Sequence, residues 1–504
     1  MTYQTFEAQI ARVNDILCTL NLLAWDSRTM MPAGGVEARA EQVATLTSLA
    51  RELATGDDMA RAIDGAKNDL ANAAPDDIRV RAVARAEQEL AVLCAVPPEV
   101  TNRLAAMSAR AHSAWVAARA ANDFAAYAPM LEQIMALQRQ VASAIGGAHP
   151  YDAMVGRFEP GMTWARLQEI YAELKTAIVP LIGRARAAGT PRHDFMSRAF
   201  PVPAQKSFAL GLAGRMGYDL GRGRLDDTAH PFEISFTRGD VRITSRFHET
   251  NFPGGVFALW HEAGHAMYEQ NIAPEFTRTI FATDLVNLYA VGGASFSMHE
   301  AQSRMWENRV GRTPEFWDLH YGALRDAFPD QLSDVSVETF WRAVNRVNPS
   351  LIRVEADELT YDMHIILRSE IEAALMAGDI AVNDLPAVWS EKMKTLLDVD
   401  VPDDASGVLQ DVHWAHGYVG SFPTYTLGNI MSAQLFAVAE TAPGVRDGLR
   451  TGNYAPLFAF MREAVWRHGR AATPDETLQR VAGSALDPAA YIAHLSHKVE
   501  RLVA

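Results

Sequence analysis

The chain is poor in cysteine and has no long apolar run. Cys18 and Cys94 are its two cysteines among 504 residues, and both lie in apolar stretches with helical spacing. We therefore expect two buried thiols and no disulfide. No apolar segment approaches the roughly 20 residues of a membrane-spanning helix, and residues 1–7 lack the basic region that begins a secretion signal. These absences predict a cytoplasmic protein with no membrane partner.

Positive charge is also scarce. Lys and Arg number 46 against 61 Asp and Glu, which gives a formal net charge of −15. An acidic chain is repelled by phosphate backbones, so nucleic acid is not an expected partner. Hydrophobic residues make up 49% of the chain, as is typical of a globular protein with a large core.

No linker, low-complexity tract or internal repeat divides the chain. We therefore predict a single, mainly α domain over residues 1–504, with an N-terminal helical part over roughly 1–145 and a catalytic part over roughly 200–504. Ala-rich segments with helical spacing support the helical architecture. They cover residues 36–53, 79–93, 98–121 and 127–145.

Residues 231–247 carry the clearest β signal. Two alternating runs flank Thr237-Arg238-Gly239 and predict a hairpin. Alternation places one set of side chains on each face: Val241, Ile243 and Phe247 against Arg242, Thr244 and Arg246. An edge of this hairpin could pair with an extended peptide, or the hairpin could be a structural element packed on helices.

The pentapeptide from His261 to His265 has the pattern HExxH. On a helix the two histidines lie one turn apart on one face, so both rings can reach a single cation, for which zinc is expected. Asn251 and Pro253 provide a helix start. The alternative is a pair of surface histidines on an ordinary amphipathic helix.

Glu262 follows the first of these histidines and is a candidate general base. It can reach a water at the open position of the metal. A bound zinc brings the pKa of such a water to roughly 7 and polarises a carbonyl group. This chemistry hydrolyses amides.

Catalytic zinc normally takes three protein ligands, so one more is needed. Asn271 stands where an HExxHxxGxxH site would have its third histidine. Residues 296–308 have helical spacing and contain Glu300, our choice, although this carboxylate could simply pair with Arg304. The residues alone leave three rivals open: Glu269, Asp284 and His299.

HEAGHAMYEQ at 261–270, followed by HEAQSRMWEN at 299–308, resembles the zinc site of the carboxypeptidase Taq family of metallocarboxypeptidases. The resemblance implies that Glu300 completes a His, His, Glu ligand set. Other motifs resemble the family in the same order along the chain. They are WDSRTMMP at 25–32, YD at 151–152, FEPGM at 158–162, DVRIT at 240–244, IRVEADE at 352–358, GVLQDVHW at 407–414 and FPTY at 422–425.

The resemblance implies a large helical metallopeptidase with a deep central groove and a small β-hairpin or sheet beside the zinc helix. It also implies a homodimer that acts on peptides and binds Zn²⁺, with Co²⁺ or Mn²⁺ as substitutes. Two departures stand out. The span from His265 to Glu300 is longer than usual, which predicts an insertion within residues 276–295, and Ser421 stands where the family commonly has Tyr.

A carboxypeptidase needs a cation that holds the free carboxylate of its substrate, and the planar fork of arginine suits this role. Arg353, in the family-like 352–358 motif, is our first candidate, and the alternative is a helix-start pair with Asp357. Arg242 and Arg246 on the predicted hairpin are further candidates.

His413 and Tyr425 lie in a Gly- and aromatic-rich stretch. By resemblance they belong to the active-site cleft, where each could donate a hydrogen bond to the oxyanion. A histidine beside Trp414 could instead be a packed core residue. The predicted function is a zinc-dependent carboxypeptidase of broad specificity. The alternatives are an oligopeptidase that cuts internally and an inactive helical protein that binds peptides.

Overall fold

The computed structural model describes residues 2–504. Contacts within it group the chain into two compact units, each built from three separate segments. The first unit contains the described residues up to 94, then 193–344 and 435–485, and the second contains 95–192, 345–434 and 486–504. The predicted single domain, with parts near 1–145 and 200–504, stays a prediction.

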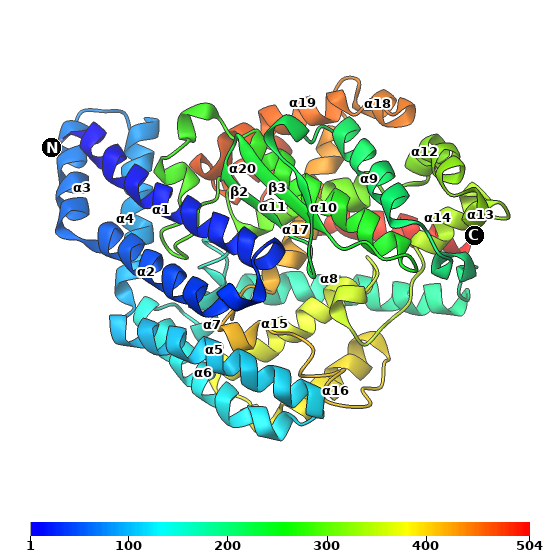
Figure 1. Cartoon of the computed structure of the whole chain (residues 1–504), viewed down its shortest axis with the longest axis horizontal. Coiled ribbons are helices and arrows are strands. Elements are labelled where there is room, and N and C mark those ends of the chain that lie inside the picture. The colour runs from blue at the N-terminus through cyan, green and yellow to red at the C-terminus, as the bar shows by residue number, and fades with distance from the viewer. Residues whose placement is uncertain (1) are drawn as a thin grey trace. The chain divides into compact units, whose positions relative to one another are not determined.

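The first unit is largely helical (Figure 1). Its α-helices are α1 (Tyr3–Thr29), α2 (Val36–Thr55), α3 (Asp57–Asp69), α4 (Ile78–Ala95), α9 (Val202–Met216), α10 (Phe252–Gln270), α11 (Phe296–Arg304), α12 (Pro314–Ala327), α13 (Pro329–Leu332), α14 (Val337–Val344), α18 (Val445–Thr451), α19 (Ala455–Ala464) and α20 (Pro474–Ala482).

The second unit is helical as well. It contains α5 (Pro98–Ala121), α6 (Phe124–Ile145), α7 (Pro150–Val155), α8 (Trp164–Ala187), α15 (Tyr361–Ala377), α16 (Leu385–Leu397), α21 (Ala489–Val503) and most of α17 (Pro423–Ala439). The four Ala-rich segments are α2, α4, α5 and α6, so these helix predictions are confirmed. Helix α6 begins before residue 127 because the Asp123 side chain accepts a hydrogen bond from the Ala126 N–H and caps it.

The strands of residues 2–504 form one three-stranded sheet in the first unit, in the order β1-β3-β2. The predicted hairpin is the antiparallel pair β2 (Glu233–Thr237) and β3 (Asp240–Ser245). Sequence reasoning missed β1 (Leu225–Asp227), a strand of three residues that pairs in parallel with β3. Three residues are too few to show alternation.

Both predicted faces of β3 carry buried side chains. Val241 and Ile243 are buried on one face, and Thr244 on the opposite face is fully buried too. Its hydroxyl accepts from the Phe232 N–H at 2.8 Å and donates to the carbonyl oxygen of the same residue at 2.9 Å. A central strand can bury a hydroxyl at low cost when its hydrogen bonds are satisfied in this way.

The prediction of two buried thiols is half wrong. Cys18 on α1 is half-buried, and its thiol donates to the carbonyl oxygen of Phe236 at 2.8 Å. Cys94 is exposed near the end of α4, where the neighbouring Leu93 faces the core. Neither cysteine is in a disulfide, as predicted.

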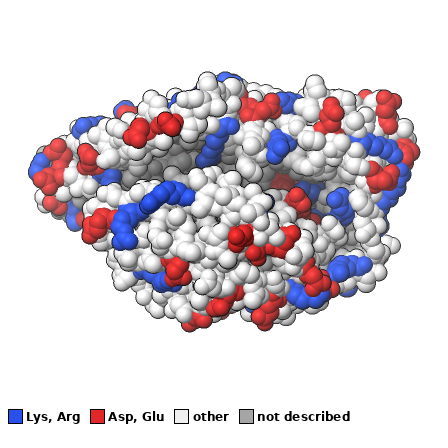
Figure 2. Space-filling model, turned by 60° about the horizontal axis from the view of Figure 1, so that its bottom comes forward, with Lys and Arg blue, Asp and Glu red and all other residues white. Residues whose placement is uncertain are grey.

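The surface carries both signs of charge. On the face shown in Figure 2, Lys and Arg side chains are interspersed with Asp and Glu. Such a mixture does not create the one-signed field that attracts nucleic acids. No helix among residues 2–504 is both long and apolar enough to cross a membrane.

Candidate metal centre

The HExxH motif lies in the middle of α10, as predicted. The Asn251 side chain accepts the Gly254 N–H at 3.2 Å and Pro253 stands in the first turn, so the helix begins where the sequence indicated. Helix α10 packs beside β2, β3 and α11 (Figure 1). His261 and His265 therefore face a neighbouring helix from the same side of α10.

Gly264 sets how closely α10 and α11 approach each other. A Cβ atom added at this residue would lie 2.6 Å from the carbonyl oxygen of Gln302 and 2.6 Å from Cα of Ser303. Since real Cβ contacts are not this short, the helices can meet here only because the residue is glycine. The close approach brings α11 near the histidines.

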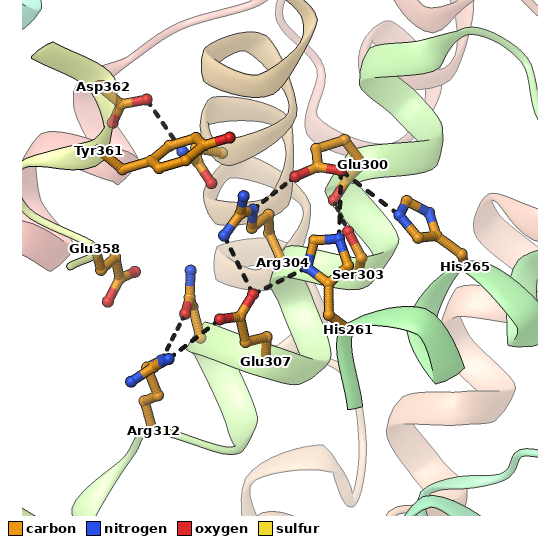
Figure 3. A network of polar contacts seen from close by, with 12 residues as sticks. His261, His265, Glu300, Ser303, Arg304, Glu307, Arg312, Glu358, Tyr361 and Asp362 are labelled. Atoms are coloured by element: carbon orange, nitrogen blue, oxygen red, sulfur yellow. Dashed lines mark hydrogen bonds and ion pairs between the residues drawn. The ribbon is translucent and has the colours of Figure 1, made fainter. Parts of the chain in front are cut away.

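Three ligand atoms converge between these helices. Glu300 Oε2 lies 3.6 Å from His261 Nε2 and 3.5 Å from His265 Nε2 (Figure 3). A tetrahedral zinc ion with bonds of about 2.0–2.2 Å holds its ligand atoms roughly 3.4 Å apart. The spacing and chemistry of this set fit a divalent ion. No other cluster of three such residues was found within residues 2–504.

Carboxylate and guanidinium groups surround His261. Its Nδ1 lies 2.9 Å from Oε2 of Glu307, on the opposite side of the ring from Nε2. Glu307 also accepts from Nη1 of Arg304 and from Nη2 of Arg312, each at 3.2 Å. Arg304 donates through Nε to Oε1 of Glu300 at 2.7 Å. Arg304 therefore connects Glu300, one candidate ligand, to the carboxylate of Glu307 that contacts His261, another candidate ligand (Figure 3).

Sequence reasoning missed Glu307, and the local helix geometry explains its position. Helix α11 ends at Arg304 and continues as a π-helix, η6 (Met305–Val310), which carries Glu307. Such wide turns are frequent at functional sites. A signal existed, because a residue seven positions after Glu300 lies two turns along on nearly the same helix face.

His265 has a second histidine behind it. Its Nδ1 lies 2.6 Å from Nδ1 of His299, and Nε2 of His299 lies 3.0 Å from Oε1 of Glu269. Two of the three rivals for the third ligand position thus contact each other. The third rival, Asp284, lies 4.0 Å from the guanidinium of Arg470.

The electrostatics of the centre suit a cation. Burial raises the pKa of Glu262 to about 7. Burial also lowers the pKa of His265 to about 3, so that ring is neutral at pH 7. For His261, burial opposes protonation, but the carboxylates of Glu300 and Glu307 outweigh it and raise the pKa to about 10. Without an ion, a proton on His261 compensates the surrounding negative charge.

Arg353, the predicted carboxylate-binding residue, lies in the second unit on the short 3₁₀ helix η7 (Arg353–Glu355). Its Nε and Nη2 donate to Oδ1 of Asp411 at 3.0 and 2.8 Å. The alternative pairing with Asp357 is not found, since that carboxylate instead accepts the N–H of Leu359 at 3.0 Å. Arg353 is 7% exposed.

Arg368 is a second arginine at this cluster, and sequence reasoning missed it. It is fully buried in α15 and donates through Nε to Oδ2 of Asp411 at 2.6 Å and through Nη2 to Gln410 at 2.7 Å. Asp411 and Gln410 lie more than 40 residues away in the chain. No local pattern could therefore have assigned them.

His413 lies close to Asp411, and Tyr425 lies close to Arg353. The His413 ring packs on Phe422 with ring centres 4.5 Å apart, and its Nδ1 is 3.9 Å from Asp411. Burial lowers the pKa of His413 to about 4, so the neutral ring offers one N–H donor. The Arg353 guanidinium lies 5.6 Å from the centre of the Tyr425 ring.

Comparison with known proteins identifies the family. The profile of the family described as Carboxypeptidase Taq (M32) metallopeptidase matches residues 5–499. The chain belongs to this family. The resemblance that the motifs indicated is confirmed, and membership in a metallopeptidase family implies a divalent metal.

Individual M32 relatives match over nearly their whole length. Carboxypeptidase 1 of Bacillus subtilis is 37% identical over 509 residues, covering 100% of this chain and 99% of that protein. Thermostable carboxypeptidase 1 of Thermus thermophilus is 39% identical, with 95% of both chains covered. The crystal structure of an M32 carboxypeptidase from Deinococcus radiodurans has a TM-score of 0.94 at 38% identity, with 99% of both chains covered. The predicted helical fold with a small sheet is thereby confirmed.

Arg242, in the DVRIT motif of this M32 chain, makes contacts of another kind. Its guanidinium pairs with Asp240 through two hydrogen bonds of 2.9 Å and lies 4.3 Å from the centre of the Trp25 ring. The contact with Trp25 attaches β3 to α1 and favours a packing role. Substrate binding by Arg242 stays a prediction.

Proposed function

We propose that this chain is a zinc-dependent carboxypeptidase that removes residues from the free C-termini of peptides with broad specificity. The convergence of His261, His265 and Glu300 beside the buried carboxyl of Glu262 carries this proposal. Membership in the M32 metallopeptidase family supports it.

The ion would be held by His261, His265 and Glu300, and when bound it supplies a Lewis acid that polarises the scissile carbonyl and acidifies water. Glu262 takes the proton of the attacking water on a carboxylate oxygen and gives it to the leaving amine. A pKa of about 7 suits a group that must both accept and release a proton near neutral pH. The nearby backbone of Glu233 acts against the effect of burial and lowers the pKa of this carboxyl.

In this proposal Arg353 binds the terminal carboxylate of the substrate. Asp411 holds its Nε and Nη2, while Nη1 points to the Tyr361 hydroxyl at 3.3 Å. A guanidinium fixed in this way loses little further freedom when a carboxylate binds, so binding costs less. His413 and Tyr425 would donate hydrogen bonds to the oxyanion, an effect worth roughly a few kcal/mol.

We propose zinc as the metal of this enzyme. Two imidazoles and a carboxylate form a ligand set that zinc commonly takes in hydrolases, and Co²⁺ or Mn²⁺ would substitute. We also propose that the enzyme works in the cytoplasm as a homodimer. The motif resemblance suggests the dimer, and the scarcity of cysteine suits a reducing compartment.

The test compares one peptide as the free acid and as its C-terminal amide. Each is incubated with protein that has been stripped by a chelator and then given no metal, Zn²⁺ or Co²⁺. Stepwise, metal-dependent release of amino acids from the free acid alone is the expected result. The Glu262→Gln variant, purified in parallel, controls for contaminating peptidases.

Two other outcomes would overturn the proposal. Internal cleavage of both peptides would show an oligopeptidase that does not need a free C-terminus. Metal binding without cleavage of either peptide would show a protein that has kept the site and lost the activity.

A further inference from the structure

His265 contacts a short series of buried polar side chains that the proposed reaction does not use. Its Nδ1 lies 2.6 Å from Nδ1 of His299, whose Nε2 lies 3.0 Å from Oε1 of Glu269. The three side chains are 14%, 14% and 5% exposed. All three groups belong to the first unit.

Glu269, at the far end, is surrounded by donors. Its carboxylate accepts the N–H of Gly292 at 3.0 Å, the N–H of Gly293 at 2.8 Å and the hydroxyl of Ser235 at 3.2 Å. Since a carboxylate with these neighbours acts as an acceptor, the contact with His299 requires a hydrogen on Nε2 of that ring. The contact with Glu269 thus places a hydrogen on Nε2 of His299.

The remaining protons follow from the chemistry of imidazole. An imidazole that carries its single hydrogen on Nε2 has a lone pair on Nδ1. The 2.6 Å contact between the two Nδ1 atoms then needs the hydrogen of His265 on its own Nδ1. This leaves a lone pair on Nε2 of His265, the atom that lies 3.5 Å from Glu300.

We propose that Glu269 and His299 form a relay that fixes His265 in its metal-binding tautomer and orientation, and that both are positioning residues of this enzyme. The proposal rests on the proposed function, because it takes His265 as a metal ligand. The two histidines of the motif would then be oriented differently. His261 uses the carboxylate of Glu307 directly, whereas His265 reaches a carboxylate through a second imidazole.

The loop before α11 is shaped to serve this relay. A Cβ atom on Gly293 would lie 2.5 Å from Cδ2 of His299, and one on Gly292 would lie 3.1 Å from Oε2 of Glu269. Glycine at both positions lets the backbone N–H groups reach the carboxylate without displacing the ring. The segment that we predicted to carry an insertion therefore supplies two donors to the relay.

Helix α1 and the core hold this loop in place. Asn21 of α1, which is buried, donates to the carbonyl oxygens of Ala290 and Ser235 at 2.9 Å each. Four loop side chains belong to a hydrophobic cluster with α1, α3 and α4: Ile280, Phe281, Leu285 and Ala290. The relay thus ends on a rigid part of the first unit, as orientation of a ligand requires.

The test compares His299→Asn with His299→Leu. The Oδ1 atom of Asn can accept the hydrogen of His265 Nδ1, whereas Leu, which is closer to His in volume, offers no acceptor. Zinc affinity is measured at pH 7.5 by competition with a chelator. We expect His299→Leu to lose about 10- to 100-fold in affinity and His299→Asn to lose clearly less. A purely packing role predicts the reverse order, and that result would overturn the proposal.

A second variant covers the case in which His299 substitutions do not fold. Glu269→Gln keeps the side-chain size but turns an amide toward the donors, and we expect about a tenfold loss of zinc affinity. We also expect the absorption spectrum of the Co²⁺-loaded protein to change. Wild-type affinity and spectrum in folded Glu269→Gln would refute the relay.

Two controls separate this proposal from the proposed function. His320→Leu removes another buried histidine of the first unit, whose Nε2 contacts the Tyr454 hydroxyl at 2.7 Å, and should leave zinc affinity unchanged. His265→Ala should abolish tight binding. If His265→Ala keeps the metal, the proposed centre fails. If His265→Ala loses the metal while His299→Leu keeps wild-type affinity, the relay alone fails.

Discussion

Nδ1 of His261 lies 2.9 Å from Oε2 of Glu307, while Nε2 of the same ring faces Glu300 at 3.6 Å. A carboxylate behind a ligating imidazole raises its basicity and fixes its orientation. We expect Glu307→Gln to lower zinc affinity by about 10- to 100-fold, because the amide is a poorer acceptor and its NH₂ faces the guanidinium of Arg304. A chelator competition titration measures this.

The same substitution should also destabilise the metal-free protein. Glu307 is the partner of two partly buried arginines, and removing one member of such a network costs about 3–5 kcal/mol. Glu338→Gln on α14 removes an exposed carboxylate that pairs with Arg342, and it should change neither property. Unchanged zinc affinity in a folded Glu307→Gln protein would contradict the role that we give this residue.

Glu262→Gln should separate metal binding from catalysis. The side chain is not in the ligand set, so we expect zinc affinity to stay within about twofold of the wild type. Without a carboxylate that can take a proton, kcat should fall by about 10²- to 10⁴-fold. Steady-state release of amino acids and metal titration on the same preparation test both parts. Loss of the metal in this variant would mean that the roles are assigned wrongly.

Gly264→Ala should disturb the metal centre by pushing the backbones of α10 and α11 apart. The new methyl group would meet backbone atoms of Gln302 and Ser303 at 2.6 Å, so α11 must shift away from α10 and carry Glu300 with it. We expect the protein to lose about 1–3 kcal/mol of stability and to bind zinc at least tenfold more weakly. Chemical denaturation and metal titration measure these effects.

Gly322→Ala is the matched control for that change. Gly322 lies inside α12 and has no heavy atom within 4 Å of the added Cβ position. Alanine there should stabilise the protein by about 0.5–1 kcal/mol, because it reduces the conformational entropy of the unfolded chain and clashes with nothing in the folded protein. If Gly264→Ala stabilised the protein as Gly322→Ala does, the distance between α10 and α11 would not restrict the side chain at residue 264.

The sequence predicted those features that depend on neighbours in the chain. The start of α10 follows from Asn251 and Pro253, and the shared face of His261 and His265 follows from their spacing. Glu300 needed the family resemblance, because residue types alone left Glu269, Asp284 and His299 open as rivals.

The residues that support the site could not be assigned from local spacing. Spacing places Glu307 on nearly the same helix face as Glu300, but its contact with His261 on another helix, made from a π-helical turn, is not a local feature. Arg353 pairs with Asp411, 58 residues on, although Asp357 is only four residues away. In both cases the partner is chosen by tertiary packing. Helical periodicity indicates which residues share a face and leaves the opposite helix or loop undetermined.

His320 should make stability depend on pH at a position outside the metal centre. Burial, followed by the charge of Arg215, lowers its pKa to about 4, so the folded protein keeps the ring neutral where the unfolded chain protonates it near pH 6.5. Between these values the unfolded state binds more protons. Stability from this residue is therefore complete above pH 6.5 and declines as the pH falls toward 4.

Denaturant unfolding of metal-free wild type and His320→Gln between pH 4.5 and 7.5 tests this. Gln keeps a polar partner for the Tyr454 hydroxyl but cannot titrate in this range. The free energy of unfolding of the variant should fall with decreasing pH less steeply, by up to about 1.4 kcal/mol per pH unit. Parallel profiles for the two proteins would mean that His320 is protonated in the folded state, and the contact with Tyr454 would then have to be made by an imidazolium that donates to the phenol oxygen.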